Sequence, residues 1–332
     1  MQPTSDTSLQ RPDLGAAVWE TMQNAPEQGY IGLQVMPLFG VTKNSAEYPV
    51  IPKESLFNLL DATRASHGGY NRFDDEFESG YYVTSEKGLE HRIDRRYAAI
   101  YSSLFAYELT ISRILMNNIL RAQEKRIADK IMNASNFTAH NATVAWDTPA
   151  TADPLKDINA GRESLRASGI TPNKLIINYT NYMQLIAMKK VQDAVYQIFP
   201  DAAKTGNIGI KHLEAYLDIP ILLAGALYNT AKRGQDASLS DLWGTRYAML
   251  CRVASGDITE PCIGRTFIWN ESGNGAAETI VEQYYKEEIR SDILRVRHDV
   301  SESFLLSRDE NGTAKSEISK ACGYLIDTTA AS

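Results

Sequence analysis

The chain has 332 residues, of which 43% are hydrophobic and 23% charged, and its formal net charge is -7 at pH 7. This composition excludes an intrinsically disordered chain and allows a sizeable core divided over about two compact units. The acidic balance excludes a dedicated nucleic-acid binder, because such a protein normally presents a basic face that releases counterions from phosphates.

The amino-terminal part is predicted to be a flexible arm, residues 1 to about 29, followed by an extended strap. In the strap, Met36, Tyr48 and Ile51 each precede a proline, which keeps them out of the helical region of backbone space. The first residues are polar, and no run of about 18 apolar residues follows anywhere. We therefore expect a protein made in the cytosol, without a membrane segment.

The stretch from Ala65 to Arg96 has little apolar periodicity, and a segment of this length does not bury itself. Its acidic side chains are Asp74, Asp75, Glu76 and Glu78. Its clustered basic side chains are Arg92, Arg95 and Arg96. Two interpretations are open: a loop whose charges only confer solubility, or an arm that docks acid against base between neighbouring copies. In the second case charge sets the register, since exposed pairs contribute only about 0–1 kcal/mol each.

The next segment carries the strongest helical pattern in the chain. From Ile100 to Ile131, apolar side chains recur mostly three and four residues apart, which is typical of an amphipathic helix. Neither glycine nor proline interrupts the run. The pattern predicts one helix from Tyr97 to Met132, about 50 Å long, with a two-part helical hairpin as the alternative.

Further along, Asp153 as N-cap, Pro154 in the first turn and Gly169 after the last turn predict a helix over residues 154–168. A second helix is expected over 181–197 and a short one over 212–216. Strands are expected over 175–178, 219–224, 264–270 and 293–300, and the pair Asn311 and Gly312 predicts a hairpin. Helices and strands alternate without a regular βαβ order, which favours an α+β fold.

Motifs for catalysis are missing from the sequence. It contains no GxSxG, no P-loop, no GxGxxG after a strand and no HExxH, and its five histidines are scattered. Adjacent acids such as Glu287 and Glu288 do not face each other on a helix. The three cysteines form no Cys-x-x-Cys pair, so buried free thiols are expected. We assign no catalytic, cofactor-binding or metal-binding residue and expect a protein that is not an enzyme.

The block from Trp243 to Trp269 closely resembles one region of tailed-bacteriophage major capsid proteins. Other family-like segments follow one another in the same order. They are VMPLFGV, EYPVIPKE, GLEHRID, the long helix with Glu108 and Glu124, SGITPNKLIINYTNY, LDIPILLAGALYNTAKRG, GRTFIW, VEQYY and SDILRVR. Together they make nearly the whole chain resemble the Hong Kong 97-like capsid fold.

The resemblance implies a division of the chain into an arm and strap (1–61), an extended loop lying across a neighbouring subunit (62–96) and two domains. The peripheral domain would comprise 97–157, with a spine helix over 97–133, and return strands over 291–332. The axial domain would comprise 158–290. Lysines of the loop, such as Lys87, are interpreted as surface residues and not as cross-linking sites.

The function implied is that of a major capsid protein, which forms the pentamers and hexamers of an icosahedral head around double-stranded DNA. Its location would be the virion, after assembly in the host cytoplasm. Implied partners are a separate scaffolding protein, a portal protein, decoration proteins and DNA bound without sequence specificity. The alternative is an encapsulin-like shell that encloses a cargo enzyme.

Overall fold

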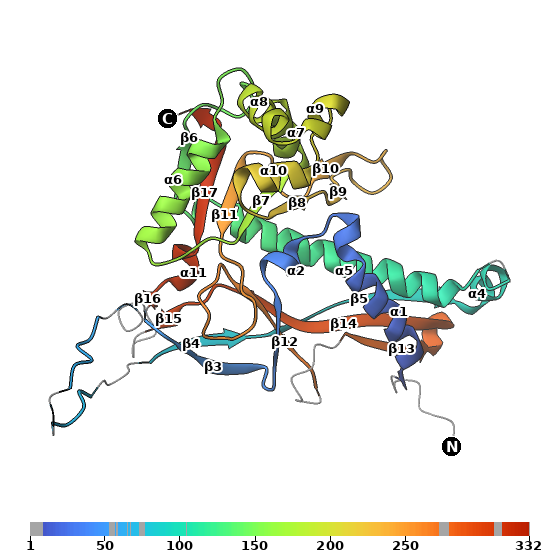
Figure 1. Ribbon diagram of the computed structural model, residues 1–332. Helices are drawn as coiled ribbons and strands as arrows, with labels where there is room; N and C mark the ends of the chain where they lie inside the picture. Colours follow the sequence, from blue (N-terminus) through green and yellow to red (C-terminus); the bar gives the residue numbers. More distant parts are fainter. Residues whose placement is uncertain are drawn as a thin grey trace.

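The computed structural model describes residues 9–52, 57, 59–64, 66, 68–72, 77–103, 105–271, 279–308 and 314–331. In this part of the chain, two large sheets lie below and above the long helix α5 (Tyr107–Ile131) in the view of Figure 1. None of the described helices has the length and apolar character needed to cross a membrane.

The lower sheet is built around β14, whose 13 residues pair with three other strands. Its order is β1 (Leu9–Gln10), β13 (Ile280–Lys286), β14 (Ser291–Ser303), β12 (Arg265–Trp269) and β2 (Leu38–Val41), with β5 (Ser85–Asp94) also on β14. Along β14, buried positions recur mostly at every second residue, as expected for a strand with one face on the core. That core includes Leu294 and Val296 of β14 and several side chains of α5.

The upper sheet has the order β6 (Ala139–Ala142), β17 (Gly323–Ala331), β11 (Tyr247–Cys251), β7 (Lys174–Asn178) and β8 (Ile221–Ala224). The helices of this upper part are α6 (Pro154–Ala167), α7 (Tyr179–Ala187), α8 (Lys189–Ile198), α9 (Pro200–Thr205) and α10 (Ile210–Leu217). Its central strands are buried on both faces, as the run Leu175, Ile176 and Ile177 illustrates.

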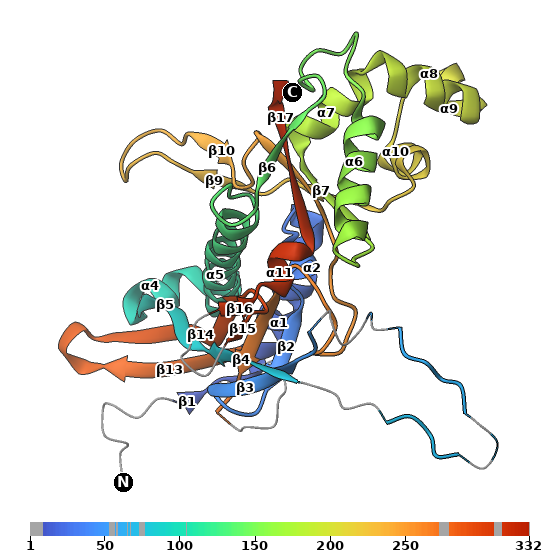
Figure 2. The same ribbon diagram turned by 90° about the vertical axis from the view of Figure 1, so that its left-hand side faces the viewer.

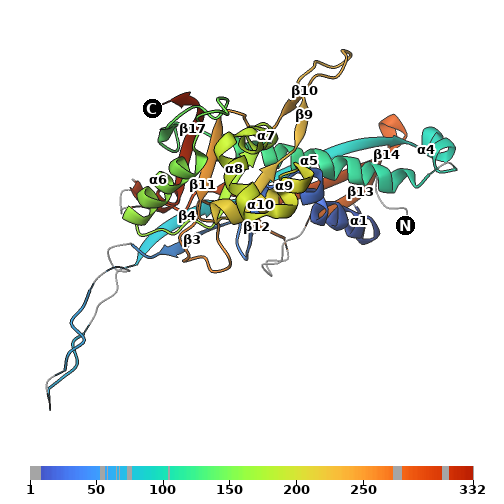
Figure 3. The ribbon, with the colours of Figure 1, turned by 45° about the horizontal axis from the view of Figure 1, so that its top comes forward.

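Two smaller sheets complete the described strands. One has the order β16 (Ala314–Ser316), β15 (Ser307–Arg308), β4 (Glu78–Val83) and β3 (Ser45–Val50). The other is the hairpin of β9 (Leu227–Asn229) and β10 (Leu239–Asp241), which projects from the body in Figure 3. Two further short helices of the described part are η2 (Glu287–Ile289) and α11 (Ile318–Ala321).

Several predicted elements are confirmed. Helix α6 begins after Asp153, whose side chain accepts a hydrogen bond from the amide of Lys156, and Gly169 follows it with a φ of +76°. Strands β7, β8, β12 and β14 lie where strands were predicted. The helix predicted over 181–197 is present as α7 and α8, which are separated at Met188 by a single residue in extended conformation.

The prediction of an unbroken helix from Tyr97 is wrong. A short helix α4 (Arg95–Tyr101) ends before α5 begins at Tyr107. At the break, the hydroxyl groups of Ser102 and Ser103 donate to the carbonyl oxygens of Ala99 and Ile100, and such local bonds compete with helix continuation. Ile100, predicted for the buried face, is 52% exposed as a result.

The prediction of a flexible arm is also wrong for residues 12–28. They form α1 (Pro12–Gln23) and η1 (Ala25–Gln28), and a single helical turn α2 (Gly32–Val35) follows. Leu14 and Val18 are buried because their spacing of four places them on the one face of α1 that packs against α5.

Within the range 65–96, the residues from Glu78 onward form β4 and β5, which belong to sheets of the body. Strand β5 pairs with β14 in continuous register from Ser85 opposite Val300 to Asp94 opposite Ser291. The segment that projects as a loop therefore precedes β4. In Figures 1, 2 and 3 this loop lies at the opposite end of the molecule from α4.

The two large sheets do not follow the predicted division of the chain. Strands β12 and β13, from the range assigned to the axial domain, pair with β14. Strand β17 lies in the range 291–332, which was predicted to return to the peripheral domain. It pairs instead with β11 and β6 in the upper sheet. The chain passes between the sheets more often than a division into contiguous ranges allows.

Candidate subunit interfaces

The acidic and basic residues singled out in the sequence fall in different structural settings. Asp74, Asp75 and Glu76 lie outside the described residues, and Glu78 is the half-buried first residue of β4. The three arginines lie together where β5 meets α4. Asp94 stabilises this junction, because its carboxylate caps α4 by accepting a hydrogen bond from the amide of Arg96 at 2.8 Å.

Arg95 is already engaged within its own chain. Its guanidinium donates to the Asp292 carboxylate at 2.9 and 3.1 Å and lies 4.0 Å from the ring centroid of Tyr285. Arg92 and Arg96 are exposed, and in the described part of the chain neither has a carboxylate within ion-pair distance. Of the three arginines among the predicted contact residues, these two are the ones whose charge is unpaired in the described part of the chain.

The sequence did not indicate that the aromatic side chains beside these arginines are exposed. Tyr97, Tyr101 and Phe105 follow one another at intervals of four residues, with ring centroids 6.3 and 6.1 Å apart, and Tyr107 lies 5.4 Å from Tyr101. The spacing of four was the available signal, but the predicted buried face of the helix included only Ile100, Leu104 and Tyr107 of this stretch. The rings instead lie on the outside of the α4–α5 junction.

A buried carboxylate joins the strap, the long helix and the region after β10. Glu124 of α5 accepts hydrogen bonds from the amides of Ile31 and Gly32 at 2.8 and 2.7 Å, and from Trp243 Nε1 at 2.6 Å. Burial raises the pKa of Glu124, while the three hydrogen bonds act in the opposite direction. This network connects Ile31 and Gly32 of the strap to α5 and to Trp243.

The other recognised glutamate of α5 also holds the amino-terminal region. Glu108 pairs with Arg11 at 3.2 Å, and Arg11 in turn pairs with Asp13 at 2.7 Å. Because Arg11 directly precedes α1, the pair helps to place α1 on α5. These charges are partly exposed, so their contribution is modest.

A second buried ionic group joins α5 to the lower sheet. The Glu302 carboxylate lies 2.7 Å from Arg126 and 3.9 Å from Lys87. Burial opposes its ionisation, but the hydrogen bond and charge of Arg126 prevail and lower the pKa of Glu302. His298 is buried nearby, and burial together with the Arg126 charge lowers its pKa to about 4.

The interpretation of Lys87 as a plain surface lysine is wrong. Its ammonium group donates to the Val300 carbonyl at 3.1 Å and to the Ser85 hydroxyl at 3.0 Å. Burial lowers the pKa of Lys87, although the charge of Glu302 partly offsets this. The side chain points back onto β14 because β5 pairs with that strand.

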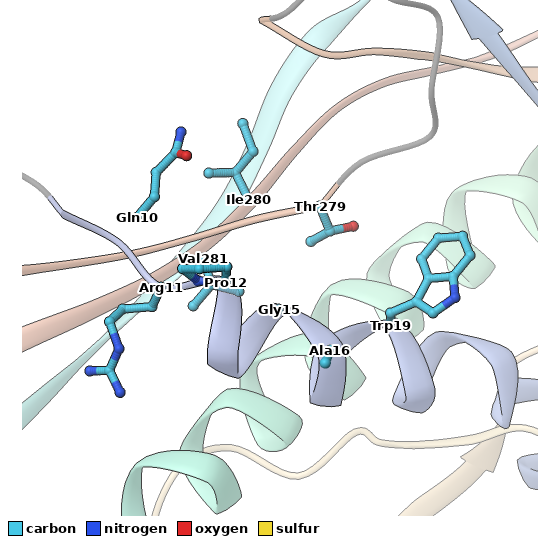
Figure 4. A pocket seen from close by; sticks show the side chains of 9 residues that line it. All are labelled: Gln10, Arg11, Pro12, Gly15, Ala16, Trp19, Thr279, Ile280 and Val281. Carbon is cyan, nitrogen blue, oxygen red and sulfur yellow. The ribbon is translucent and has the colours of Figure 1, made fainter.

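A shallow groove of about 350 Å³ lies between the first half of α1 and the start of β13 (Figure 4). Its walls are largely apolar and include Trp19, Ile280 and Val281. Arg11 is the only ionisable group among the side chains that line it, and its guanidinium is paired with carboxylates of the same chain. The groove therefore resembles a packing surface more than a reaction site.

The described residues contain no group of three or more His, Cys, Asp or Glu side chains able to hold a metal ion. The prediction of buried free thiols is confirmed for Cys251, Cys262 and Cys322. Burial raises the pKa of Cys322 to about 12, and a thiol in this state is unreactive near neutral pH. Exposed apolar side chains are grouped at the projecting loop and at the α4–α5 junction.

No family model and no curated protein matches the sequence. The fold is similar to that of a phage-related protein from Bordetella bronchiseptica RB50, with 20% identity, a TM-score of 0.67 and coverage of 98% of this chain and 99% of that one. It is similar to a virus-like particle protein from Pyrococcus furiosus, with 10% identity, a TM-score of 0.54 and coverage of 95% and 98%. A protein in the head structure of Helicobacter pylori bacteriophage KHP40 matches with 14% identity, a TM-score of 0.54 and coverage of 88% of both chains. This chain therefore has the Hong Kong 97-like fold that occurs in the heads of tailed phages.

Proposed function

We propose that this chain is a major capsid protein, which assembles into pentamers and hexamers of an icosahedral phage head enclosing double-stranded DNA. The observation that carries the proposal is the projecting loop before β4. Its side chains Phe57, Leu59, Leu60 and Phe77 are all more than half exposed, and Leu59 is 100% exposed. Apolar side chains grouped on a projecting segment indicate a contact with another protein.

The shape of the subunit supports the same proposal. The loop lies at one end of the molecule and the α4–α5 junction at the other (Figures 1 and 2). A subunit with contact surfaces at opposite ends can make head-to-tail contacts, and such contacts form rings when the rotation between neighbours closes. Since neighbours bind only the folded subunit, assembly adds to its apparent stability by mass action.

Within this proposal, the peripheral part of the subunit is the β14 sheet with α5, and the axial part is the β11 sheet with α6 to α10. The residues before β4 act as the extended loop across a neighbour. DNA is held without sequence specificity inside a shell of acidic subunits. Scaffolding, portal and decoration proteins are the further partners that the fold suggests.

Asp74, Asp75, Glu76 and Glu78 are proposed to approach basic groups of an adjacent subunit, with Arg92 and Arg96 as the unpaired cations. Arg95 contributes less, because Asp292 already neutralises it. A variant that replaces Asp74, Asp75 and Glu76 with lysine is expected to lower the yield of particles and to make the remaining particles sensitive to salt. Unchanged yield and salt tolerance would contradict this assignment.

The function is tested by expressing the chain and examining it by sedimentation and negative-stain microscopy. Closed particles tens of nanometres across are the expected result, and a monodisperse monomer would refute the proposal. The similarity to the virus-like particle protein from Pyrococcus furiosus makes an encapsulin-like shell the second candidate. Nuclease-protected DNA in native particles supports the phage head, whereas a packaged enzyme supports the alternative.

A further inference from the structure

Three cationic side chains converge on one glutamate between α5 and the lower sheet, and we call Lys87, Arg126 and Lys130 the cation cluster. The Arg126 guanidinium lies 2.7 Å from the Glu302 carboxylate, and Lys87 Nζ lies 3.9 Å from it. Lys130 Nζ donates to the backbone carbonyl oxygen of Glu302. Because Lys87 belongs to β5 and the other two cations to α5, the cluster spans two elements of the fold.

The cation cluster carries more positive charge than its surroundings neutralise. Among the described residues, Glu302 is the one carboxylate within ion-pair distance of it. Asp299 lies on the opposite face of β14, where Arg297 is 4.0 Å away. Burial lowers the pKa of Lys87, and the neighbouring charges of Arg126 and Lys130 add to this effect, while Glu302 and Asp299 oppose it. One nearby carboxylate against three cations leaves an excess of two positive charges, which a further anion would neutralise.

A buried histidine lies beneath the cation cluster. His298 pairs with Lys87 across the two strands and lies on the same face of β14 as Glu302, four residues further along. It is 3% exposed, and its Nε2 atom has no hydrogen-bond partner in the described part of the chain. Buried polar atoms without a partner are uncommon, and an ion or water often accounts for them. An anion held by the cluster would give Nε2 an acceptor for its proton.

The cluster can be reached from solvent and has the donors that a tetrahedral oxyanion requires. The side chains of Lys87 and Arg126 are 28% and 32% exposed, whereas that of Glu302 is 4% exposed. Nε and Nη2 of Arg126 donate to Glu302, and Nη1 has no acceptor within the described residues. Guanidinium and ammonium groups bind phosphate oxygens well. The two negative charges of a phosphate dianion also match the excess charge of the cluster.

We propose that Lys87, Arg126 and Lys130 form a binding site for a phosphate group, with His298 as a buried donor beneath it. Inorganic phosphate and the backbone of DNA both present this chemistry. A bound phosphate holds α5 on β5 and β14, because it contacts side chains from both sides of their interface. The site is complete in a single folded chain, so it goes beyond the proposed function and does not depend on assembly.

Binding is tested on unassembled chains labelled with ¹⁵N-histidine and titrated with inorganic phosphate, with ionic strength held constant by potassium chloride. The ring signals of His298, identified by their loss in His298→Gln, are expected to shift saturably with phosphate. Lys130→Met should weaken phosphate binding about tenfold, as for the loss of one charged hydrogen-bond donor. Lys125→Met is the matched control on the same helix, because Lys125 is 42% exposed and pairs with Asp129, and it should bind as the wild type does. Equal affinities of the two lysine variants, or no saturable shift, would overturn the proposal.

Thermal unfolding provides a second measurement. Phosphate stabilises many proteins without binding at a site, so the difference between the two lysine variants is what counts. At a phosphate concentration ten times the dissociation constant, the unfolding temperature of Lys125→Met should rise about 2 °C more than that of Lys130→Met. Lys87→Met replaces Lys130→Met in both measurements if the latter does not fold. The same rise in both variants would overturn the proposal.

A short DNA duplex, added at the same concentration of phosphate groups, distinguishes the two sources of the ligand. A shift of the His298 signals by the duplex, reversed by inorganic phosphate, would support the site and identify the DNA backbone as its ligand. A shift by inorganic phosphate alone would support the site and identify the free anion. Phosphate binding in a chain that forms no particles would support the site and refute the shell, whereas particles from a chain that binds no phosphate would do the reverse.

Discussion

Replacing Glu124 with alanine tests how the strap is held on the long helix. The carboxylate is 3% exposed and is the acceptor for three buried donors, two amides of the strap and the Trp243 indole. The substitution leaves all three donors without their partner. It also removes atoms that fill the space beside Gly32, where a Cβ atom would lie 2.4 Å from the Glu124 carboxylate.

The expected loss in the free energy of unfolding follows from the number of buried donors that lose their acceptor. Each buried donor left unsatisfied costs roughly 1–3 kcal/mol, and the small gain from placing alanine in a helix, about 0.5 kcal/mol or less, does not offset this. Part of the cost is recovered because a buried charge disappears. We therefore expect Glu124→Ala to lower the free energy of unfolding by about 3–5 kcal/mol, against a typical total of about 5–15 kcal/mol.

The assay is urea unfolding of unassembled chains, followed by tryptophan fluorescence. Glu20→Ala is the control, because it breaks an exposed pair with Arg113 between α1 and α5 and should cost less than about 1 kcal/mol. Amide exchange at Ile31 and Gly32 should accelerate in Glu124→Ala and not in Glu20→Ala. If the two variants unfolded at the same urea concentration, the network would not stabilise the strap.

Glu124→Gln tests the charge separately. Since burial raises the pKa of Glu124 above 4.5, the folded chain retains this proton where the unfolded chain loses it. Wild-type stability should therefore fall as pH rises from about 4.5 through the raised pKa. The glutamine variant should lack this component, and an unchanged slope would contradict the assignment.

Three further predictions concern buried charges and glycines. Lowering the pH from 6.5 to about 4 should cost roughly 3 kcal/mol of stability through His298, because its pKa is lowered to about 4 in the folded chain, so that over this range the unfolded chain binds a proton that the folded chain does not. His298→Gln should flatten this part of the pH profile, and an unaltered profile would argue against it. Glu302→Gln should destabilise the chain by about 2–4 kcal/mol in thermal unfolding, because it leaves the cations around it without a buried counter-charge, whereas a loss below 1 kcal/mol would show that water replaces the carboxylate. Gly29→Ala should lower the free energy of unfolding by at least about 2 kcal/mol, since φ is +81° and the new Cβ would lie 2.7 Å from the Gly225 backbone. Gly15→Ala should instead stabilise α1 by about 0.5–1 kcal/mol, because its new Cβ meets nothing within 4 Å. Similar unfolding temperatures for the two glycine variants would refute this reasoning.

Elements whose ends depend on nearby residues were predicted well. The N-cap Asp153, Pro154 and Gly169 define α6 through hydrogen bonds and backbone preferences that act within a few residues. The predicted strands likewise appear where short apolar runs are bounded by turn residues. By contrast, α1 went unrecognised because a polar beginning was given more weight than the spacing of Leu14 and Val18.

For the candidate interface, the sequence placed Arg92, Arg95 and Arg96 close together, because they are close in the chain. It did not indicate that Arg95 is paired with Asp292, almost 200 residues away. Nor did it show that the aromatic side chains beside them are exposed. Apolar side chains four residues apart occur on exposed as well as on buried helical faces. Which face is buried depends on where the sheet packs against the helix.

The sequence by itself therefore determined the α+β class, the order of most elements and the resemblance to a capsid fold, since these depend on local spacing and on short segments in order. Only the tertiary structure decided that β12 and β13 join β14, that β17 joins β11, and that Glu124 meets Ile31, Gly32 and Trp243. The backbone hydrogen bonds that pair two strands depend very little on which side chains the strands carry. Partners distant in the chain are selected by the burial of whole faces, which no single segment specifies.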